Sequence, residues 1–170
     1  MSILVSAARY LSIRLHASKT PTGFVPLSKV HTAVVFVDAD EPGVQALIDS
    51  VVKYFSSKGI KAGVFAVSAA KVPEQLKGAV VLGRRNVGWY GKPRRHGRRA
   101  VKTDLGEELF VNLFGRYNFT AEFCASASNA SFKVARSHSS KGVYNMLVTS
   151  EGFDQNSVFT QMAGLLDTVK

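Results

Sequence analysis

The run of β-branched and aromatic residues at 32–37 (TAVVFV) constrains the fold more than any other feature of the sequence. Because it is apolar on both faces, it predicts a strand inside a sheet that is covered on both sides. Two similar runs follow, at residues 63–67 and 78–82. Between the first two, apolar residues repeat at helical spacing from Val44 to Phe55. This strand–helix–strand order predicts an α/β domain with a mainly parallel central sheet.

The second half of the chain continues the alternation. We expect strands at 108–114, 132–135 and 144–148, a helix at 119–127, and a closing helix at 158–169. Within the first of these helices, Phe119, Phe123 and Cys124 are expected to face the interior. A chain of 170 residues is the size of one domain. We therefore predict a single-domain, Rossmann-like three-layer sandwich with an N-terminal helical arm.

The first 29 residues form that arm, and residues 30–170 form the α/β domain. Apolar residues at helical spacing predict an amphipathic helix that packs on the domain: Ile3, Leu4, Ala7, Ala8, Leu11 and Leu15. The segment 17–29 contains Pro21, Gly23 and Pro26 and is expected to be a linker. An acid-free start with Arg and Ser also matches an organellar transit peptide, so both interpretations stay open.

Positive charge is concentrated in one loop. The chain carries a net charge of +10, and eight basic residues but no acidic one lie between Arg84 and Lys102. Without that stretch the net charge falls to +2. We interpret residues 84–102 as a basic loop insertion in an otherwise nearly neutral domain. A second acid-free stretch, residues 1–37, makes the N-terminal arm mildly basic.

The basic loop favours contact with nucleic acid. Arginine forks bind phosphates, and aromatic rings stack on unpaired bases. No groove-reading helical motif accompanies the loop, which favours RNA over DNA. The alternative is a solvated loop in which Trp89 packs down as an anchor. The predicted RNA-binding residues are Arg84, Arg85, Trp89, Tyr90, Lys92, Arg94, Arg95, Arg98, Arg99 and Lys102.

The second half of the chain resembles a known group of proteins. Its segments VGWYGKPRR, EELFVNLFGRYNFTAEFCASASNASFKVAR and YNMLVTSEGFD occur in that order. Over roughly residues 80–166 they are similar to an uncharacterised family of small cytoplasmic Bacteroidetes proteins. The resemblance implies a fold and a cytoplasmic setting, and it implies no activity. The loop here contains more arginine than the family pattern does.

Two further groups of charged residues flank the predicted strands. The acids Asp38, Asp40 and Glu41 follow the first strand. Two interpretations stay open: the three carboxylates hold Mg²⁺, or they start a helix with Asp40 as its N-cap. Arg116 and Tyr117 follow the strand at 108–114, at the edge where open α/β sheets bind ligands. A smaller basic group consists of Lys133, Arg136, His138 and Lys141, of which Lys133 and Arg136 fall on opposite faces of a strand.

Other chemistry is not indicated. The single Cys124 has no histidine or aspartate at a telling spacing, and the four histidines form no metal-ligand pair. Nucleotide-binding and nucleophile-elbow motifs are absent. No apolar run approaches the roughly 20 residues needed to cross a membrane. We therefore predict no catalytic residue, no metal and no cofactor.

The function that the sequence favours is RNA binding by a non-enzymatic, cytoplasmic protein. Ribosomal RNA and neighbouring ribosomal proteins are the expected partners. One alternative is an enzyme that acts on a nucleotide or phosphosugar at the carboxyl edge of the sheet, near Asp38, Asp40 and Arg116. The other is a protein-interaction module in which Trp89 and Tyr90 bind an acidic partner.

Overall fold

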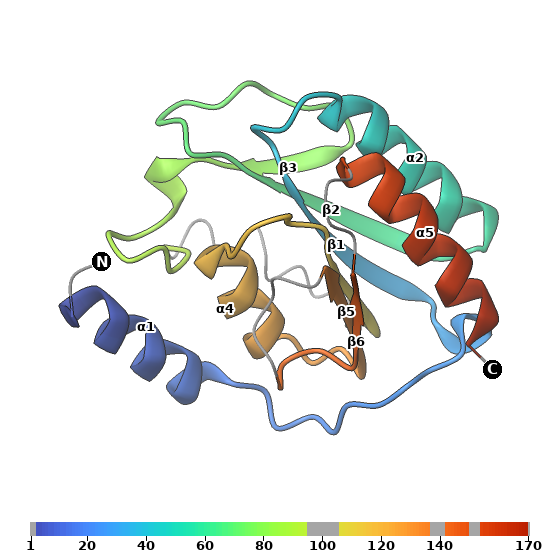
Figure 1. The fold of residues 1–170 in the computed structure, drawn as a ribbon, viewed down its shortest axis with the longest axis horizontal. Helices are drawn as coiled ribbons and strands as arrows, with labels where there is room; N and C mark the ends of the chain where they lie inside the picture. Colours follow the sequence, from blue (N-terminus) through green and yellow to red (C-terminus); the bar gives the residue numbers. More distant parts are fainter. Residues whose placement is uncertain (1–2, 95–105, 137–141, 150–153, 170) are drawn as a thin grey trace.

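A computed structural model describes residues 3–94, 106–136, 142–149 and 154–169. Its centre is a six-stranded sheet in which every neighbouring pair of strands is parallel (Figure 1). The strand order is β3-β2-β1-β4-β5-β6. The strands span Thr32–Asp38 (β1), Lys61–Val67 (β2), Ala79–Leu82 (β3), Leu109–Asn112 (β4), Phe132–Arg136 (β5) and Met146–Val148 (β6).

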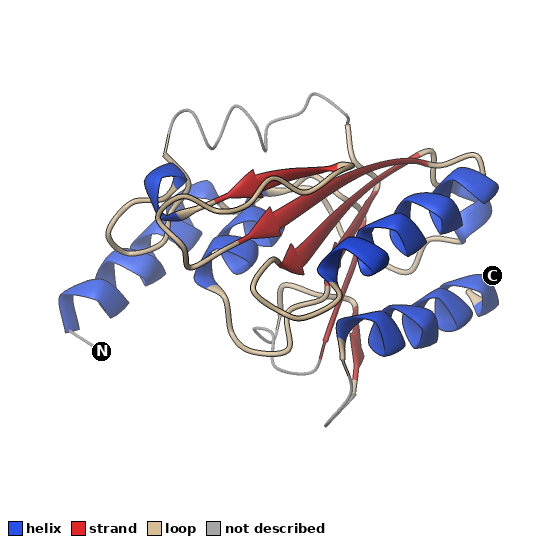
Figure 2. Cartoon of the chain, turned by 90° about the horizontal axis from the view of Figure 1, so that it is seen from above, coloured by secondary structure: helices blue, strands red, loops and turns tan. Residues whose placement is uncertain are grey.

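Helices cover both faces of the sheet, so the predicted three-layer α/β sandwich is confirmed (Figures 1 and 2). One face carries α2 (Val44–Ser57) and α5 (Gln155–Thr168). The other face carries α4 (Phe119–Ala127), against which α1 (Ile3–His16) packs. No described helix is long and apolar enough to span a membrane.

The apolar run of β1 explains the position of the core. Val35 and Val37 face α2 and α5, whereas Val34 and Phe36 face α4. Phe36 is fully buried and stacks on Phe65 of β2 and Phe110 of β4, with ring centroids 5.3 Å apart in both pairs. Both faces of β1 pack into hydrophobic core, so apolar side chains occupy successive positions of the strand. This explains why the apolar run is continuous.

The N-terminal helix packs with the face opposite to the one predicted. Its apolar stripe points outward, and the exposed fraction is 86% for Ile3, 54% for Leu11 and 77% for Leu15. Ser12 and the partly buried Ile13 face the domain instead. The segment after the helix runs without strand to a 3₁₀ turn at Leu27–Lys29. Backbone hydrogen bonds fasten it to the domain, from Ser18 N to Ser126 O and from Gly23 N to Ser131 O, both 2.8 Å.

The predicted cap of the helix after β1 is also wrong. Helix α2 begins after Gly43, which has a φ of +76° and provides no capping side chain. Asp40 instead accepts hydrogen bonds from Ser68 Oγ (2.6 Å) and Ala69 N (2.7 Å). Because Ser68 directly follows β2, the carboxylate links the ends of two neighbouring strands. Such a partner, 28 residues away in the sequence, cannot be found from a local capping pattern.

Candidate functional site

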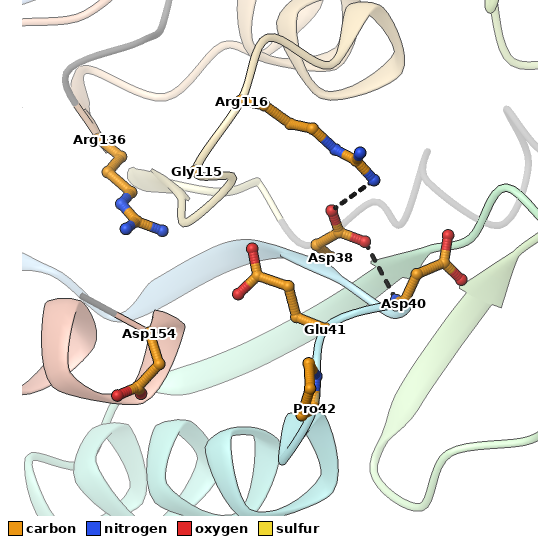
Figure 3. Close-up of a pocket in the computed structure, with 8 residues that line it drawn as sticks. All are labelled: Asp38, Asp40, Glu41, Pro42, Gly115, Arg116, Arg136 and Asp154. Atoms are coloured by element: carbon orange, nitrogen blue, oxygen red, sulfur yellow. Dashed lines mark hydrogen bonds and ion pairs between the residues drawn. The ribbon is translucent and has the colours of Figure 1, made fainter. Parts of the chain in front are cut away.

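A charged cleft lies at the carboxyl edge of the sheet, where the connections of β1 and β4 diverge. The chain leaves β1 toward α2 on one face and leaves β4 toward α4 on the other, and open α/β sheets bind ligands at such a point. The cleft has a volume of about 580 Å³. Its lining residues are Asp38, Asp40, Glu41, Pro42, Gly115, Arg116, Arg136 and Asp154 (Figure 3).

Asp38 and Arg116 face each other across one side of the cleft. The Asp38 side chain is only 3% exposed, and its Oδ2 lies 3.5 Å from Nη2 of Arg116, whose side chain is 75% exposed. Asp38 Oδ1 accepts a hydrogen bond of 3.0 Å from the backbone N of Asp40. Burial raises the pKa of Asp38, and neither the Asp40 amide nor the Arg116 guanidinium fully offsets that cost. The carboxylate is thus buried with one long, exposed ion pair.

Arg136 closes the other side of the cleft. It ends β5 and is only 6% exposed. A Cβ atom on Gly115 would lie 2.6 Å from Nη1 of Arg136 and 3.5 Å from Oε1 of Glu41. A side chain at residue 115 would therefore displace the Arg136 guanidinium, whereas Glu41 would stay at van der Waals distance. Burial and the Asp38 carboxylate raise the pKa of Glu41, and Arg136 acts in the opposite direction.

The remaining acids of the cleft already hold backbone or hydroxyl donors. Asp40 bonds to Ser68 and Ala69, and Asp154 caps α5 by accepting hydrogen bonds from Asn156 N (2.9 Å) and Ser157 N (3.0 Å). These bonds lower the pKa of Asp154. Among the residues that the structure describes, no three His, Cys, Asp or Glu side chains are placed to hold a metal ion.

The two basic residues of β5 separate as the strand alternation predicts. Lys133 is buried on the α4 side, where its Nζ donates to the backbone oxygens of Ala125 (2.7 Å) and Ser128 (2.8 Å). It thus holds the C-terminal end of α4, and burial lowers its pKa. Arg136 reaches the cleft instead. His138 and Lys141 lie outside the described residues.

Polar residues buried beneath α4 form a second cluster that the sequence did not reveal. Asn112 Nδ2 donates to Glu122 Oε1 (3.1 Å) and to the Tyr144 oxygen (2.9 Å), and the Tyr144 hydroxyl donates to Glu122 (3.0 Å). Asn112 Oδ1 also accepts from Phe114 N (3.1 Å), which shapes the turn that precedes Arg116. Cys124 lies on the same helix, and burial raises the pKa of its thiol, in keeping with its expected inward position.

The described part of the basic loop forms a compact turn beyond β3. A 3₁₀ turn at Arg84–Asn86 precedes a bridge between Val87 and Pro93. Gly88 N donates to Lys92 O (2.7 Å), and Gly91 N donates to Gly88 O (2.9 Å). Four side chains are exposed on this turn, and we call them the basic surface: Arg84, Arg85, Trp89 and Arg94.

Contacts with two helices hold the turn in place. Thr120 Oγ1 on α4 donates to Gly91 O (2.7 Å), and Arg9 Nε on α1 donates to Tyr90 O (2.8 Å). Tyr90 packs toward Phe119 with ring centroids 6.1 Å apart. Lys92 Nζ lies 3.1 Å from His16 Nε2 and 5.3 Å above the ring of Phe123.

The structure thus divides the predicted RNA-binding residues. Arg84, Arg85, Trp89 and Arg94 are exposed, whereas Tyr90 and Lys92 are partly buried against the helices. Trp89 is 70% exposed, so Tyr90 rather than Trp89 anchors the turn. Arg95, Arg98, Arg99 and Lys102 lie outside the described residues.

Comparison with known proteins assigns a family and no activity. The sequence matches DUF6913, described as a family of unknown function, over residues 6–168. The match also includes the first half of the chain, which lies outside the roughly 80–166 segment of the resemblance described above. No curated protein matches the chain.

Proposed function

Because the chain belongs to DUF6913, a family of unknown function, we propose its function from its surfaces and infer that it binds RNA through the basic surface. One observation carries the proposal. Arg84, Arg85 and Arg94 are exposed, and within the described residues no carboxylate pairs with any of them. Within the described part of the chain, the Arg94 side chain donates to one backbone oxygen, that of Val87, at 3.0 Å. Cations that no carboxylate neutralises keep their charge available for phosphates.

The way in which the turn is anchored also suits this function. Helices α1 and α4 bind the turn through the backbone oxygens of Tyr90 and Gly91 and through the side chains of Tyr90 and Lys92. The arginines of the basic surface are left out of that anchoring network. A phosphate chain can therefore bind them without breaking contacts that hold the fold.

Trp89 favours single-stranded RNA over a uniform polyanion. Its ring is 70% exposed and meets Tyr90 edge-on, with centroids 5.1 Å apart. A large exposed ring beside arginines provides a stacking platform for an unpaired base. The combination of phosphate forks and one aromatic face is what loops and bulges of folded RNA require.

The finer proposal is a place on the ribosome, as part of a cytoplasmic protein's contact with ribosomal RNA and neighbouring proteins. Helix α1 adjoins the basic surface through Arg9 and exposes an apolar stripe that includes Ile3, Leu11 and Leu15. The same helix buries Ser12, whose hydroxyl has no partner within the described residues. An exposed apolar stripe next to a basic surface suits an assembly that offers protein and RNA side by side.

The direct test is fluorescence anisotropy with a labelled single-stranded oligouridine. The variant Arg84→Ser/Arg85→Ser/Arg94→Ser is compared with the wild type and with a control that loses three exposed lysines elsewhere, Lys29→Ser/Lys53→Ser/Lys61→Ser. We expect the first variant to lose most of its affinity and the control to keep it. Equal loss in both variants would show that net charge alone matters and would contradict the proposal.

Sedimentation through a sucrose gradient tests the ribosomal setting. We expect the tagged full chain to migrate with ribosomal particles in its own cell lysate and to leave them after nuclease treatment. Recovery that does not depend on RNA would instead support the protein-interaction alternative.

A further inference from the structure

We propose that the cleft at the carboxyl edge of the sheet binds a small phosphorylated sugar, independently of the basic surface. Arg116 and Arg136 would bind the phosphate, and Asp38 and Glu41 would accept hydrogen bonds from sugar hydroxyls. The four side chains approach the opening from the ends of β1, β4 and β5 (Figure 3). Its volume of about 580 Å³ lies within the range of small-molecule pockets, roughly 300–1,000 Å³.

Arg136 is the buried cation of the cleft. The residue is only 6% exposed, and its Nη1 lies so near Gly115 that a Cβ atom there would be 2.6 Å away. Glu41 lies close enough for Arg136 to influence its pKa, and Figure 3 shows the Glu41 carboxyl group pointing between the two arginines. This side of the cleft therefore holds a cation, Arg136, beside a hydrogen-bond acceptor, Glu41.

Arg116 is the exposed cation of the cleft. The Nη2–Oδ2 distance of 3.5 Å between Arg116 and Asp38 is long for a charge-assisted hydrogen bond, and the Arg116 side chain is 75% exposed. Arg116 can therefore turn toward an incoming phosphate at little cost. Two guanidinium groups on opposite sides of one opening match the several oxygens of a phosphomonoester.

The carboxylates of the cleft favour a ligand that carries hydroxyl groups as well as a phosphate. Asp40 and Asp154 each accept two or more hydrogen bonds from backbone and hydroxyl donors. Asp38 accepts one from Asp40 N and makes the long pair with Arg116, and Glu41 interacts with Gln155 and Arg136. A carboxylate has about four acceptor sites, so Asp38 and Glu41 can still accept from a ligand. A buried Asp38 and a partly buried Glu41 next to two cations disfavour a purely anionic ligand such as inorganic phosphate. Hydroxyl groups on the same molecule would satisfy them, which favours a sugar phosphate or a nucleoside monophosphate.

Isothermal titration calorimetry on the full chain tests the proposal with three probes: ribose 5-phosphate, adenosine monophosphate and inorganic phosphate. We expect one or both sugar-containing probes to bind, with inorganic phosphate at least tenfold weaker. Binding of the first probe alone would assign a free sugar phosphate, and binding of the second alone would assign a nucleotide. Equal binding of inorganic phosphate, or no binding of any probe at millimolar concentration, would overturn the proposal.

Three variants locate the site. Arg116→Gln changes an exposed side chain and is expected to weaken binding about tenfold or more without affecting the fold. Gly115→Ala displaces the Arg136 guanidinium and is expected to weaken binding to a similar extent. Arg84→Gln, which removes an exposed arginine of the basic surface, should bind the probe as the wild type does. Unchanged affinity of Arg116→Gln would contradict the assignment even if Gly115→Ala failed to fold.

Two variants test RNA binding and sugar-phosphate binding independently of each other. The variant that loses Arg84, Arg85 and Arg94 should lose RNA and keep the sugar phosphate, whereas Arg116→Gln should do the reverse.

Discussion

The basic surface and the cleft use arginine in opposite ways. In the basic surface the arginine side chains are exposed, and the backbone and aromatic contacts of the turn provide the rigidity. In the cleft Arg136 is buried, carboxylates are among its neighbours, and its guanidinium lies against Gly115. The first arrangement suits long-range, salt-sensitive attraction to a polyanion, and the second suits the selection of a small molecule by shape.

The largest expected effect concerns the basic surface. Arg84→Ser/Arg85→Ser/Arg94→Ser should reduce affinity for single-stranded RNA by about 100-fold at low salt, because three charge-assisted contacts are lost. The slope of log affinity against log salt concentration should also fall by about 2, from roughly 0.7 for each phosphate contact. The melting temperature should stay within about 2 °C of the wild-type value, since exposed charges contribute little to stability. A large drop in melting temperature would mean that these arginines hold the fold.

The next effect tests the anchoring of the turn. Gly91 has a φ of +96°, and a Cβ atom there would lie 3.1 Å from Cδ1 of Phe119. Gly91→Ala should therefore destabilise the protein by about 2 kcal/mol through backbone strain and lost packing, and should weaken RNA binding. The matched control is Gly88→Ala, whose Cβ would meet only Lys92 O at 3.5 Å. If thermal unfolding showed equal losses for both variants, the turn would not be anchored as described.

The smallest effect concerns the cleft and has the opposite sign. Burial raises the pKa of Asp38 in the folded protein, so ionised Asp38 lowers stability at neutral pH. Asp38→Asn should raise the melting temperature by about 2–4 °C, the change that about 1 kcal/mol causes in a domain of this size. It should also weaken binding of the sugar phosphate. A gain in stability with a loss of binding is the signature of a residue kept for function.

The difference in melting temperature between the wild type and Asp38→Asn should also depend on pH. As pH falls through the raised pKa of Asp38, the wild type takes up a proton and regains the stability that the charge had removed. The melting temperatures of the wild type and of Asp38→Asn should therefore converge toward acidic pH. Curves that diverge on acidification would show that ionised Asp38 stabilises the fold.

Much of the fold could be predicted because its determinants are local. The apolar run of β1, the helical repeat of α2 and the inward residues of α4 each follow from neighbouring side chains that must be buried together. The closing helix begins at Gln155 rather than at residue 158 because Asp154, whose role as a cap was not anticipated, fixes its first turn. Burial patterns thus identify elements more reliably than they identify their ends.

The two wrong predictions share a physical reason. The pattern of α1 shows which residues form a stripe and not which side of the helix meets the domain, and the contacts of Arg9 with Tyr90 and Phe119 turn the other side inward. Asp40 matches the local pattern of an N-cap, yet its carboxylate accepts a hydrogen bond from Ser68, which follows a neighbouring strand. In both cases a partner distant in the sequence decides between locally acceptable alternatives.

The sequence predicts only some of the residues that line the cleft. Asp38, Asp40, Glu41 and Arg116 were expected at the carboxyl edge because they follow strands. The sequence places Arg136 in the smaller basic group of residues 133–141 and not in the cleft, although its position at the end of a strand next to β4 is a signal for the cleft. The close approach of the Arg136 guanidinium to Gly115 joins residues 21 positions apart, and no local pattern contains it.

Ultraviolet crosslinking of the full chain to oligouridine, followed by tryptic mapping of the attached peptide, tests the account most directly. RNA bound to the basic surface should crosslink to the peptide Asn86–Arg94, which contains Trp89 and Tyr90, and excess ribose 5-phosphate should not compete. Crosslinks confined to peptides from the cleft, or competition by the sugar phosphate, would contradict the separation of the two sites.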